Sequence, residues 1–286
     1  MNSTDMSKLL KEQCLCCGKY SLKKKLSFDI SDVYLCKNSC VFLKPKIDTN
    51  SLYTPEYFKN YYEERSSDQD KMLIKLTYFL KKYINNGSIL DYGCGIGSFL
   101  INAEKHGFKD NIGIDISKYS TSLAQSRAEN SNFYTDIGML QLKKFDCISF
   151  IDSLAHIDDI NNVFSKLIKN NLNKDGMVLI RTPNINSAYM LYVNLISYFI
   201  PKRYFGSLLF IPNRLFLFNR KAIKLFLSKH DLKVQEFFIE PEFKKISSKL
   251  SNNNYIKSLI VDIVRMWIPF LINRKNSLTI IAKRKN

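Results

Sequence analysis

The chain contains 286 residues, of which 45% are hydrophobic and 24% are charged. These fractions are those of ordinary globular proteins, and they exclude a fibrous or wholly disordered chain. The first ten residues lack the basic start and apolar core of a secretory signal, and no run approaches the roughly 18 uncharged apolar residues of a membrane-spanning helix. We therefore expect a cytoplasmic globular protein whose seven cysteines are reduced thiols or metal ligands.

The chain is strongly basic. Lys and Arg number 43 against 26 Asp and Glu, a net charge of +17, and residues 201–286 hold 18 basic and 5 acidic residues, a net charge of +13. Such a field attracts the phosphates of nucleic acids, nucleotide-sugars or anionic lipids. A lysine-rich solvated surface accounts for the same charge without any such partner, so both interpretations stay open.

Residues 1–50 form a region rich in Cys and Lys. Cys14 and Cys17 are separated by two residues, Cys36 and Cys40 by three, and 18 residues lie between the two pairs. This spacing resembles the two knuckles of a zinc ribbon, in which four thiolates hold an ion and stabilise a segment too small to fold alone. Cys16 is a competing ligand, and the second pair has one intervening residue more than ribbons usually have. We predict a structural zinc ion bound by Cys14, Cys17, Cys36 and Cys40.

Residues 51–87 are predicted to form an aromatic segment and a helix over 71–84, which the turn-forming Asn85-Asn86-Gly87 should end. From residue 88 onward, short apolar strands alternate with helical patterns, which is typical of parallel strands joined by right-handed crossovers. The expected strands are 88–93, 111–117, 145–151 and 176–183, and the helices between them are 98–106, 118–129 and 159–170. We therefore expect residues 88–286 to form an α/β domain with a Rossmann-like, doubly wound, mostly parallel seven-stranded sheet.

The alternation weakens after residue 183, and we expect an insertion over about 184–218. A helix over 220–228, a strand over 233–239, an amphipathic helix over 257–271 and a last strand over 278–283 should follow. The amphipathic helix carries Trp267 and has basic neighbours. It suits either packing on the sheet or peripheral contact with an anionic membrane surface.

A glycine-rich loop follows the first predicted strand of this domain, in SILDYGCGIGSF (88–99). The strand delivers Asp91, and alternating glycines then let the backbone turn tightly and approach a ligand closely. A dinucleotide-binding loop would have a third Gly or Ala at position 98, where this chain has Ser98. Asp115 follows the second strand, 24 residues after Asp91, near the offset at which a carboxylate accepts both ribose hydroxyls. The pattern indicates a nucleoside ligand other than a dinucleotide.

Five segments in order, ILDYGCGIGSFL, GIDIS, FYTDI, FDCISFIDSLAHIDD and DGMVLIRTPN, resemble the successive motifs of class I S-adenosylmethionine-dependent methyltransferases over residues 88–184. The resemblance implies that S-adenosylmethionine is the cofactor. It places the glycine loop at the methionine part, Asp115 at the ribose and Asp136 at the adenine. The alternative for Asp136 is a helix cap. The implied cofactor-binding residues are Asp91, Gly93, Cys94, Gly95, Gly97, Asp115, Ile116, Asp136, Ile137, Phe150 and Asp152.

Methyl transfer from a sulfonium is an in-line displacement, so the protein mainly aligns the acceptor and, for a hydroxyl, removes its proton. His156 lies just past the fourth strand, and an imidazole accepts protons near neutral pH. We predict His156 as the base, with Asp152 beside it; the alternative is that His156 caps the next helix. Ala155 stands where metal-dependent quinone methyltransferases have a second acid, which disfavours that reaction.

The acceptor is expected to contact residues 53–62 and the 184–218 insertion. Both are rich in aromatic residues, and the insertion adds Arg203 and Arg214, a combination that suits a sugar or isoprenoid joined to a phosphate. A ribbon-like N-terminus before such a core also resembles bacterial enzymes that methylate sugars or glycan intermediates. We therefore predict O-methylation of a sugar, a glycan intermediate or a lipid-linked small acceptor. The alternatives are RNA methylation, which the charge favours, and a non-catalytic zinc-ribbon protein that binds S-adenosylmethionine.

Overall fold

The computed structural model describes residues 14–18, 22–27, 31–36, 41–45, 54, 56, 66–187, 215–238 and 277–285. The chain divides into two compact units. Unit 1 comprises residues 1–49, 182–229 and 238–278, and unit 2 comprises residues 50–181, 230–237 and 279–286. Residues 182–229 group with the N-terminal segment in unit 1.

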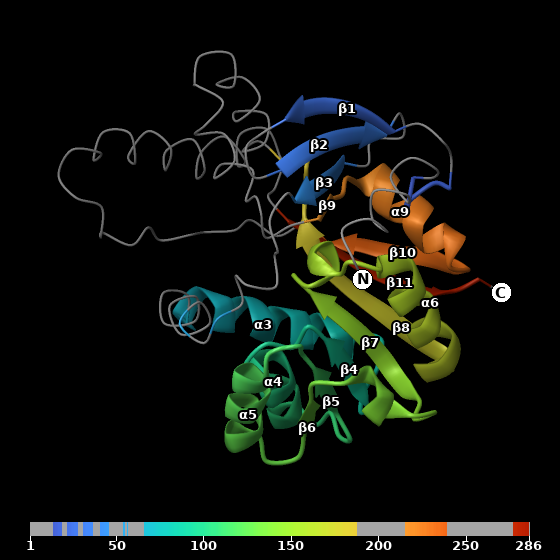
Figure 1. Cartoon of the computed structure of the whole chain (residues 1–286). Coiled ribbons are helices and arrows are strands. Elements are labelled where there is room, and N and C mark those ends of the chain that lie inside the picture. The colour runs from blue at the N-terminus through green and yellow to red at the C-terminus, as the bar shows by residue number, and fades with distance from the viewer. Residues whose placement is uncertain are drawn as a thin grey trace. The chain divides into compact units, whose positions relative to one another are not determined.

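Unit 2 is built on a seven-stranded sheet with the order β10-β11-β8-β7-β4-β5-β6 (Figure 1). The pairs β4/β5, β5/β6, β4/β7 and β7/β8 are parallel, as predicted. The first strand of the sheet, β4, lies inside it between β7 and β5, and the chain adds strands on both sides of it. Ligands of doubly wound sheets bind at this switch point, beyond the carboxyl ends of the strands. The strands are β4 (Ile89–Tyr92), β5 (Ile112–Ile114), β6 (Asn132–Tyr134), β7 (Phe145–Ile151), β8 (Leu172–Pro183), β10 (Leu232–Phe238) and β11 (Ser277–Arg284).

Helices follow the strands of unit 2 where the sequence predicted them. They are α3 (Ser66–Lys81), α4 (Ser98–Lys105), α5 (Lys118–Arg127) and α6 (Ile160–Asn171), with the short 3₁₀ helices η2 (Ile137–Leu140) and η3 (Leu154–His156). The first of these, α3, begins five residues before the predicted start and ends at Lys81. The predicted helix over 257–271 lies outside the described residues. Among the described residues, no helix is long and apolar enough to cross a membrane.

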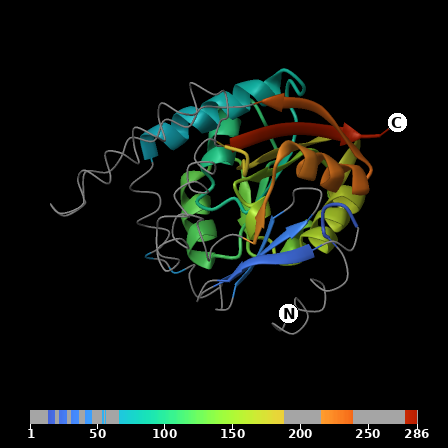
Figure 2. The same ribbon diagram turned by 90° about the horizontal axis from the view of Figure 1, so that it is seen from above.

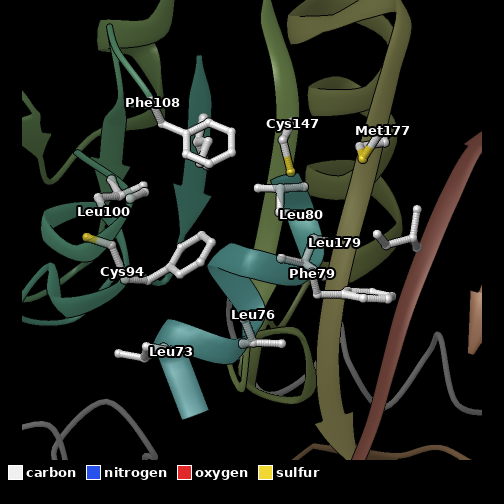
Figure 3. Close-up of a cluster of buried hydrophobic side chains, with 14 of the residues drawn as sticks. Leu73, Leu76, Phe79, Leu80, Cys94, Leu100, Phe108, Cys147, Met177 and Leu179 are labelled. Carbon is white, nitrogen blue, oxygen red and sulfur yellow. The ribbon is translucent and has the colours of Figure 1, made fainter. Parts of the chain in front are cut away.

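The sheet of unit 2 is covered on both faces, with α4 and α5 on one side and α6 on the other (Figure 2). Side chains alternate along each strand, so residues in register share a face. Cys147 and Met177 are in register and join the cluster formed by Leu76, Leu80 and other residues of α3 and α4 (Figure 3). On the opposite face, the rings of Phe150 and Phe164 of α6 lie 5.2 Å apart. Two buried layers therefore hold the central strands rigidly.

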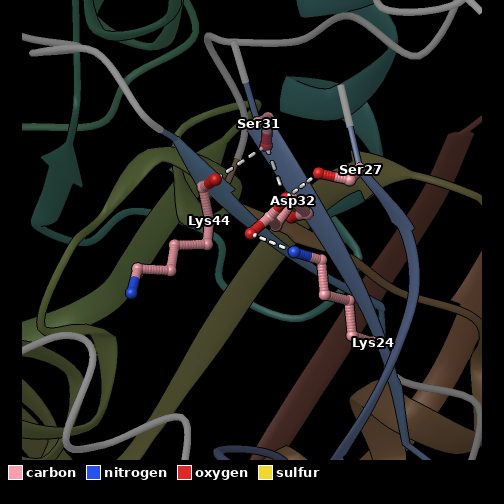
Figure 4. A network of polar contacts seen from close by, with 5 residues as sticks. All are labelled: Lys24, Ser27, Ser31, Asp32 and Lys44. Carbon is pink, nitrogen blue, oxygen red and sulfur yellow. Dashed lines mark hydrogen bonds and ion pairs between the residues drawn. The ribbon is translucent and has the colours of Figure 1, made fainter. Parts of the chain in front are cut away.

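Unit 1 contains a four-stranded sheet with the order β1-β2-β3-β9. The strands are β1 (Leu22–Ser27), β2 (Ser31–Cys36), β3 (Val41–Pro45) and β9 (Phe216–Leu217), and all three pairings are antiparallel. Asp32 accepts hydrogen bonds from Lys24 Nζ at 2.8 Å and from Ser27 Oγ at 2.6 Å, while Ser31 Oγ donates to the Lys44 carbonyl at 3.0 Å (Figure 4). These bonds link the three N-terminal strands.

The two described ends of the predicted insertion also belong to unit 1. Asn184 forms a parallel bridge with Phe218, and the Ile185 N–H donates to the Phe218 carbonyl at 2.9 Å. The chain then enters α9 (Arg220–Lys229), whose first turn is capped by Asn219 Oδ1, which accepts from the Ala222 N–H at 2.8 Å. The sequence did not predict that β9 would pair with β3, because short apolar segments do not specify their distant partners.

Candidate cofactor and active site

The loop after β4 depends on three glycines. Gly93, Gly95 and Gly97 have φ angles of 78°, 53° and 73°, in the left-handed region that other residues avoid. A Cβ on Gly93 would lie 2.3 Å from Ser153 Cβ, and one on Gly97 would lie 2.7 Å from the Phe133 ring. Glycine is therefore required at both positions for conformation and for space, and the loop leads directly into α4.

Asp91 lies in β4 beneath this loop with 2% of its surface exposed. Ser149 Oγ of the neighbouring β7 donates a hydrogen bond of 2.7 Å to its carboxyl group. Burial raises the pKa of Asp91 to about 7, the nearby Asp115 carboxylate adds to this shift, and the Ser149 bond opposes it. A buried carboxyl with such a pKa is poised to ionise when a cationic group binds nearby.

Asp115 directly follows β5 and is tied to the glycine loop. Its Oδ2 accepts from the Gly95 N–H and its Oδ1 from the Ser117 N–H, both at 2.9 Å. Burial raises the pKa of Asp115, although these two backbone donors lower it. The next residue, Ile116, is 64% exposed. Its apolar side chain is therefore accessible to a ligand next to the Asp115 carboxylate, which two backbone hydrogen bonds hold in place. The structure thus brings two sequence-predicted parts of the site together.

Asp136 caps η2 by accepting a 2.7 Å hydrogen bond from the Gly138 N–H. The described structure therefore contains the helix cap, which was the alternative role for Asp136. This cap orders the loop that follows β6. Ile137 is half-buried, and Met139 is 57% exposed. The contact of Asp136 and Ile137 with an adenine stays a prediction.

Phe150 and Cys94 are predicted cofactor residues whose side chains are buried. Phe150 is fully buried, with its ring 5.9 Å from Tyr92, because the alternation along β7 turns it toward α6 and away from the face of Ser149. Its side chain packs in the core, and its contact with the cofactor stays a prediction. Cys94 is 8% exposed, and burial raises the pKa of its thiol well above the ordinary value. Cys94 is therefore a packing residue of the loop and not a nucleophile.

An ion pair that the sequence analysis missed lies at the end of β7. Asp152 has a φ of 58°, its carboxylate pairs with the buried Arg181 of β8, and its N–H donates to the Arg181 carbonyl at 2.9 Å. The next residue, Ser153, donates from Oγ to the Tyr92 carbonyl and packs against Gly93. The sequence could have indicated that Arg181 has an anionic partner, because a basic residue inside an apolar strand requires one.

His156 is half-buried in η3, and its N–H donates to the Ser153 carbonyl at 2.9 Å. Asp159 occupies the N-cap of α6 and accepts from the Asn162 N–H. His156 keeps both alternatives, a base or a polar residue that helps to cap this helix alongside Asp158 and Asp159. Its place one turn after Ser153 leaves the predicted role as a base open to test.

Three of the four predicted metal ligands lie together in unit 1. The sulfurs of Cys14, Cys17 and Cys36 are all within 4.8 Å of one another, and those of Cys17 and Cys36 are 3.6 Å apart. Cys40 lies outside the described residues, and Cys16 is buried without being part of this cluster. Clustered thiolates are the ligands that zinc prefers in structural sites, so the donor set fits that ion.

The glycine loop at the switch point of a parallel sheet, tied to a carboxylate at the end of the next strand, defines a Rossmann-like nucleoside-binding domain. Residues 64–236 match the family described as methyltransferase domain, and the chain belongs to this family. No curated protein matches the chain.

Several solved structures share the fold. Magnesium protoporphyrin IX methyltransferase from Synechocystis PCC 6803 with bound SAH is 14% identical, with a TM-score of 0.58 over 82% of this chain and 97% of that one. A SAM-dependent methyltransferase from Archaeoglobus fulgidus is 22% identical, with a TM-score of 0.52 over 80% of this chain and 99% of that one. The plantazolicin methyltransferase BpumL in complex with SAH is 17% identical, with a TM-score of 0.52 over 83% of this chain and 94% of that one.

Proposed function

We propose that this protein is an S-adenosylmethionine-dependent methyltransferase that methylates a hydroxyl of a sugar, a glycan intermediate or a lipid-linked small acceptor. The observation that carries the cofactor assignment is the direct hydrogen bond between Asp115 and the N–H of Gly95, which joins the ribose-type carboxylate to the glycine loop. Membership of the methyltransferase family supports the reaction class. Structural neighbours with bound SAM and SAH support the choice of cofactor.

The residues present fit this cofactor. An ionised carboxylate offers about four acceptor positions, and Asp115 uses two of them for backbone N–H groups, so two stay available for ribose hydroxyls. Ile116 offers an exposed apolar surface for a base, and Asp91 offers negative charge near an ammonium group. The cofactor, when bound, supplies a methyl group activated on a sulfonium.

On the acceptor side, we propose that His156 removes the proton of the hydroxyl, since an ordinary imidazole pKa lies near 6.5. The ion pair between Asp152 and Arg181 orders the chain at the end of β7, four residues before His156. The tyrosines of 53–62 and 189–204 lie outside the described residues. The sugar-type acceptor is supported by the composition of these segments and by the resemblance of the N-terminal region. Recruitment to an anionic membrane by residues 257–271 is supported by the amphipathic pattern and basic neighbours of that segment.

We also propose that Cys14, Cys17 and Cys36 bind a structural zinc ion, with Cys40 as the predicted fourth ligand. Three thiols already lie within 4.8 Å of one another, which is close enough for a single ion to bridge them.

Isothermal titration with S-adenosylmethionine and S-adenosylhomocysteine tests the cofactor assignment. We expect a Kd in the micromolar range and at least about 100-fold weaker binding by Asp115→Ala, because two charged hydrogen bonds to the ligand are lost. Asp175→Ala, which removes an exposed carboxylate from the start of β8, is the matched control and should bind normally. Absence of binding, or a preference for NAD, contradicts the proposal.

The acceptor is tested separately, with cofactor-loaded protein and a panel of sugar, lipid-linked and RNA acceptors. Methyl transfer to a sugar-type hydroxyl supports the proposed acceptor, and His156→Gln should then lower kcat by about 100-fold with little change in KM for the cofactor. A salt-sensitive gel shift with methylated RNA as product favours the RNA enzyme. Cofactor binding without turnover on any acceptor favours the non-catalytic protein.

A further inference from the structure

The thiol cluster and the described ends of the 184–218 insertion share one sheet. Cys36 is the last residue of β2, which pairs with β3 through Leu35 and Val41. Val41 in turn pairs with Leu217 of β9. A sulfur of the cluster is therefore separated from the return strand of the insertion by a single intervening strand.

Aromatic contacts extend this connection into α9. The rings of Phe42 and Phe216 meet edge to face at 5.5 Å. Phe216 and Phe218 lie 6.4 Å apart, and Phe218 and Phe226 lie 6.1 Å apart. Because these side chains are buried, disorder in β3 would remove packing from β9 and α9 as well.

The sheet is small. Its strands have six, six, five and two residues, and the return strand is the shortest. A small core contributes little stability, and a metal or a disulfide commonly adds to it. The free energy of a structural zinc site is folding free energy, so an ion at the cluster would stabilise the elements that depend on this sheet.

We propose that the ion held by Cys14, Cys17 and Cys36 stabilises β9, α9 and the paired ends of the 184–218 insertion, and does so independently of cofactor binding. The insertion is one of the two segments predicted to contact the acceptor, and this inference rests on the zinc site and acceptor role proposed above. Asp91, the glycine loop and Asp115 belong to unit 2, whereas the cluster and the insertion ends belong to unit 1. Bound zinc would therefore stabilise the paired ends of the insertion without altering the affinity of the protein for the cofactor.

The test uses full-length zinc-loaded protein, the same protein after chelation under reducing conditions, and the variants Cys14→Ala and Cys16→Ala. Cys16 is the matched control because it is a buried cysteine two residues from Cys14 and is outside the cluster. Zinc content is measured by elemental analysis, amide exchange by mass spectrometry, and S-adenosylhomocysteine affinity by calorimetry.

Chelation and Cys14→Ala should both remove zinc and speed amide exchange in 41–45 and 215–229 by at least about tenfold, with exchange in 89–115 and the cofactor Kd unchanged. Cys16→Ala should retain zinc and protection. The proposal is overturned if the purified protein binds no zinc, if 215–229 stays protected after zinc loss, or if Cys16→Ala matches Cys14→Ala. It is also overturned if zinc removal abolishes cofactor binding. Zinc-loaded protein that fails to bind the cofactor would contradict the proposed enzyme instead, and the exchange data would still decide this inference.

Discussion

Replacing Asp91 by Asn should stabilise the cofactor-free protein in a pH-dependent way. The pKa of the buried Asp91 carboxyl is about 7, against an ordinary 3.8. The folded state therefore holds this proton more tightly than the unfolded state. The free energy of unfolding decreases as the pH rises from the ordinary pKa of 3.8 through the folded-state pKa of about 7. One pKa unit corresponds to about 1.4 kcal/mol, so ionised Asp91 costs the folded protein up to about 4 kcal/mol.

The Asp91→Asn variant lacks this cost and keeps an oxygen that can accept the Ser149 hydrogen bond. Linkage predicts that its advantage over the wild type grows by about 2 kcal/mol between about pH 5.5 and about pH 8.5. Thermal unfolding should show this as a difference in Tm that widens by about 4–8 °C over that range. The same variant should bind S-adenosylhomocysteine more weakly, because the negative charge offered to the ligand is gone.

Asp110→Asn makes the same chemical exchange at an exposed carboxylate and is the control for Asp91→Asn. The Tm of each variant is measured against pH in cofactor-free protein, so that ligand binding does not shift the unfolding equilibrium. A Tm difference for Asp91→Asn that stays constant with pH, or that shrinks at higher pH, would refute the argument that burial raises the pKa of this group.

Three further substitutions test the local structure. Gly93→Ala should lower stability by about 3 kcal/mol and abolish cofactor binding, because its Cβ would meet Ser153 at 2.3 Å with the backbone at φ 78°. Asn111→Ala should cost about 2–4 kcal/mol in urea unfolding, because its fully buried amide accepts from the Ile89 N–H and donates to a backbone carbonyl. Ser31→Ala should cost about 1 kcal/mol, because its buried hydroxyl donates to a carbonyl of β3.

Each of these has a matched control. Gly107→Ala creates similar strain at φ 90°, but the nearest atom belongs to the movable side-chain amide of Asn86, at 2.9 Å, so cofactor binding should survive. Asn132→Ala and Ser27→Ala remove the same functional groups from exposed positions and should have smaller effects than Asn111→Ala and Ser31→Ala. Equal losses within any pair would show that burial and close contact are not the cause.

The cofactor loop and most elements of unit 2 could be predicted from the sequence because their signals are local. The glycines after β4 and the acid after β5 lie within short segments whose conformation depends on neighbouring residues. The alternation of strands with helices likewise predicted a parallel sheet, and four of its pairings are parallel. The helix cap that was the alternative role for Asp136 also depends on a residue only two positions away.

Tertiary structure alone decided which distant residues meet. Ser149 reaches Asp91 across 58 positions and Asp152 reaches Arg181 across 29, and no local pattern specifies either pair. The same holds for β9, whose two residues join the N-terminal sheet and carry the ends of the insertion into unit 1. Periodicity and turn chemistry act over a few residues, whereas strand partners and buried charge pairs depend on the packing of the whole fold. The sequence by itself thus determined the type of enzyme domain, and the tertiary structure determined that the thiol cluster and the described ends of the 184–218 insertion belong to one unit.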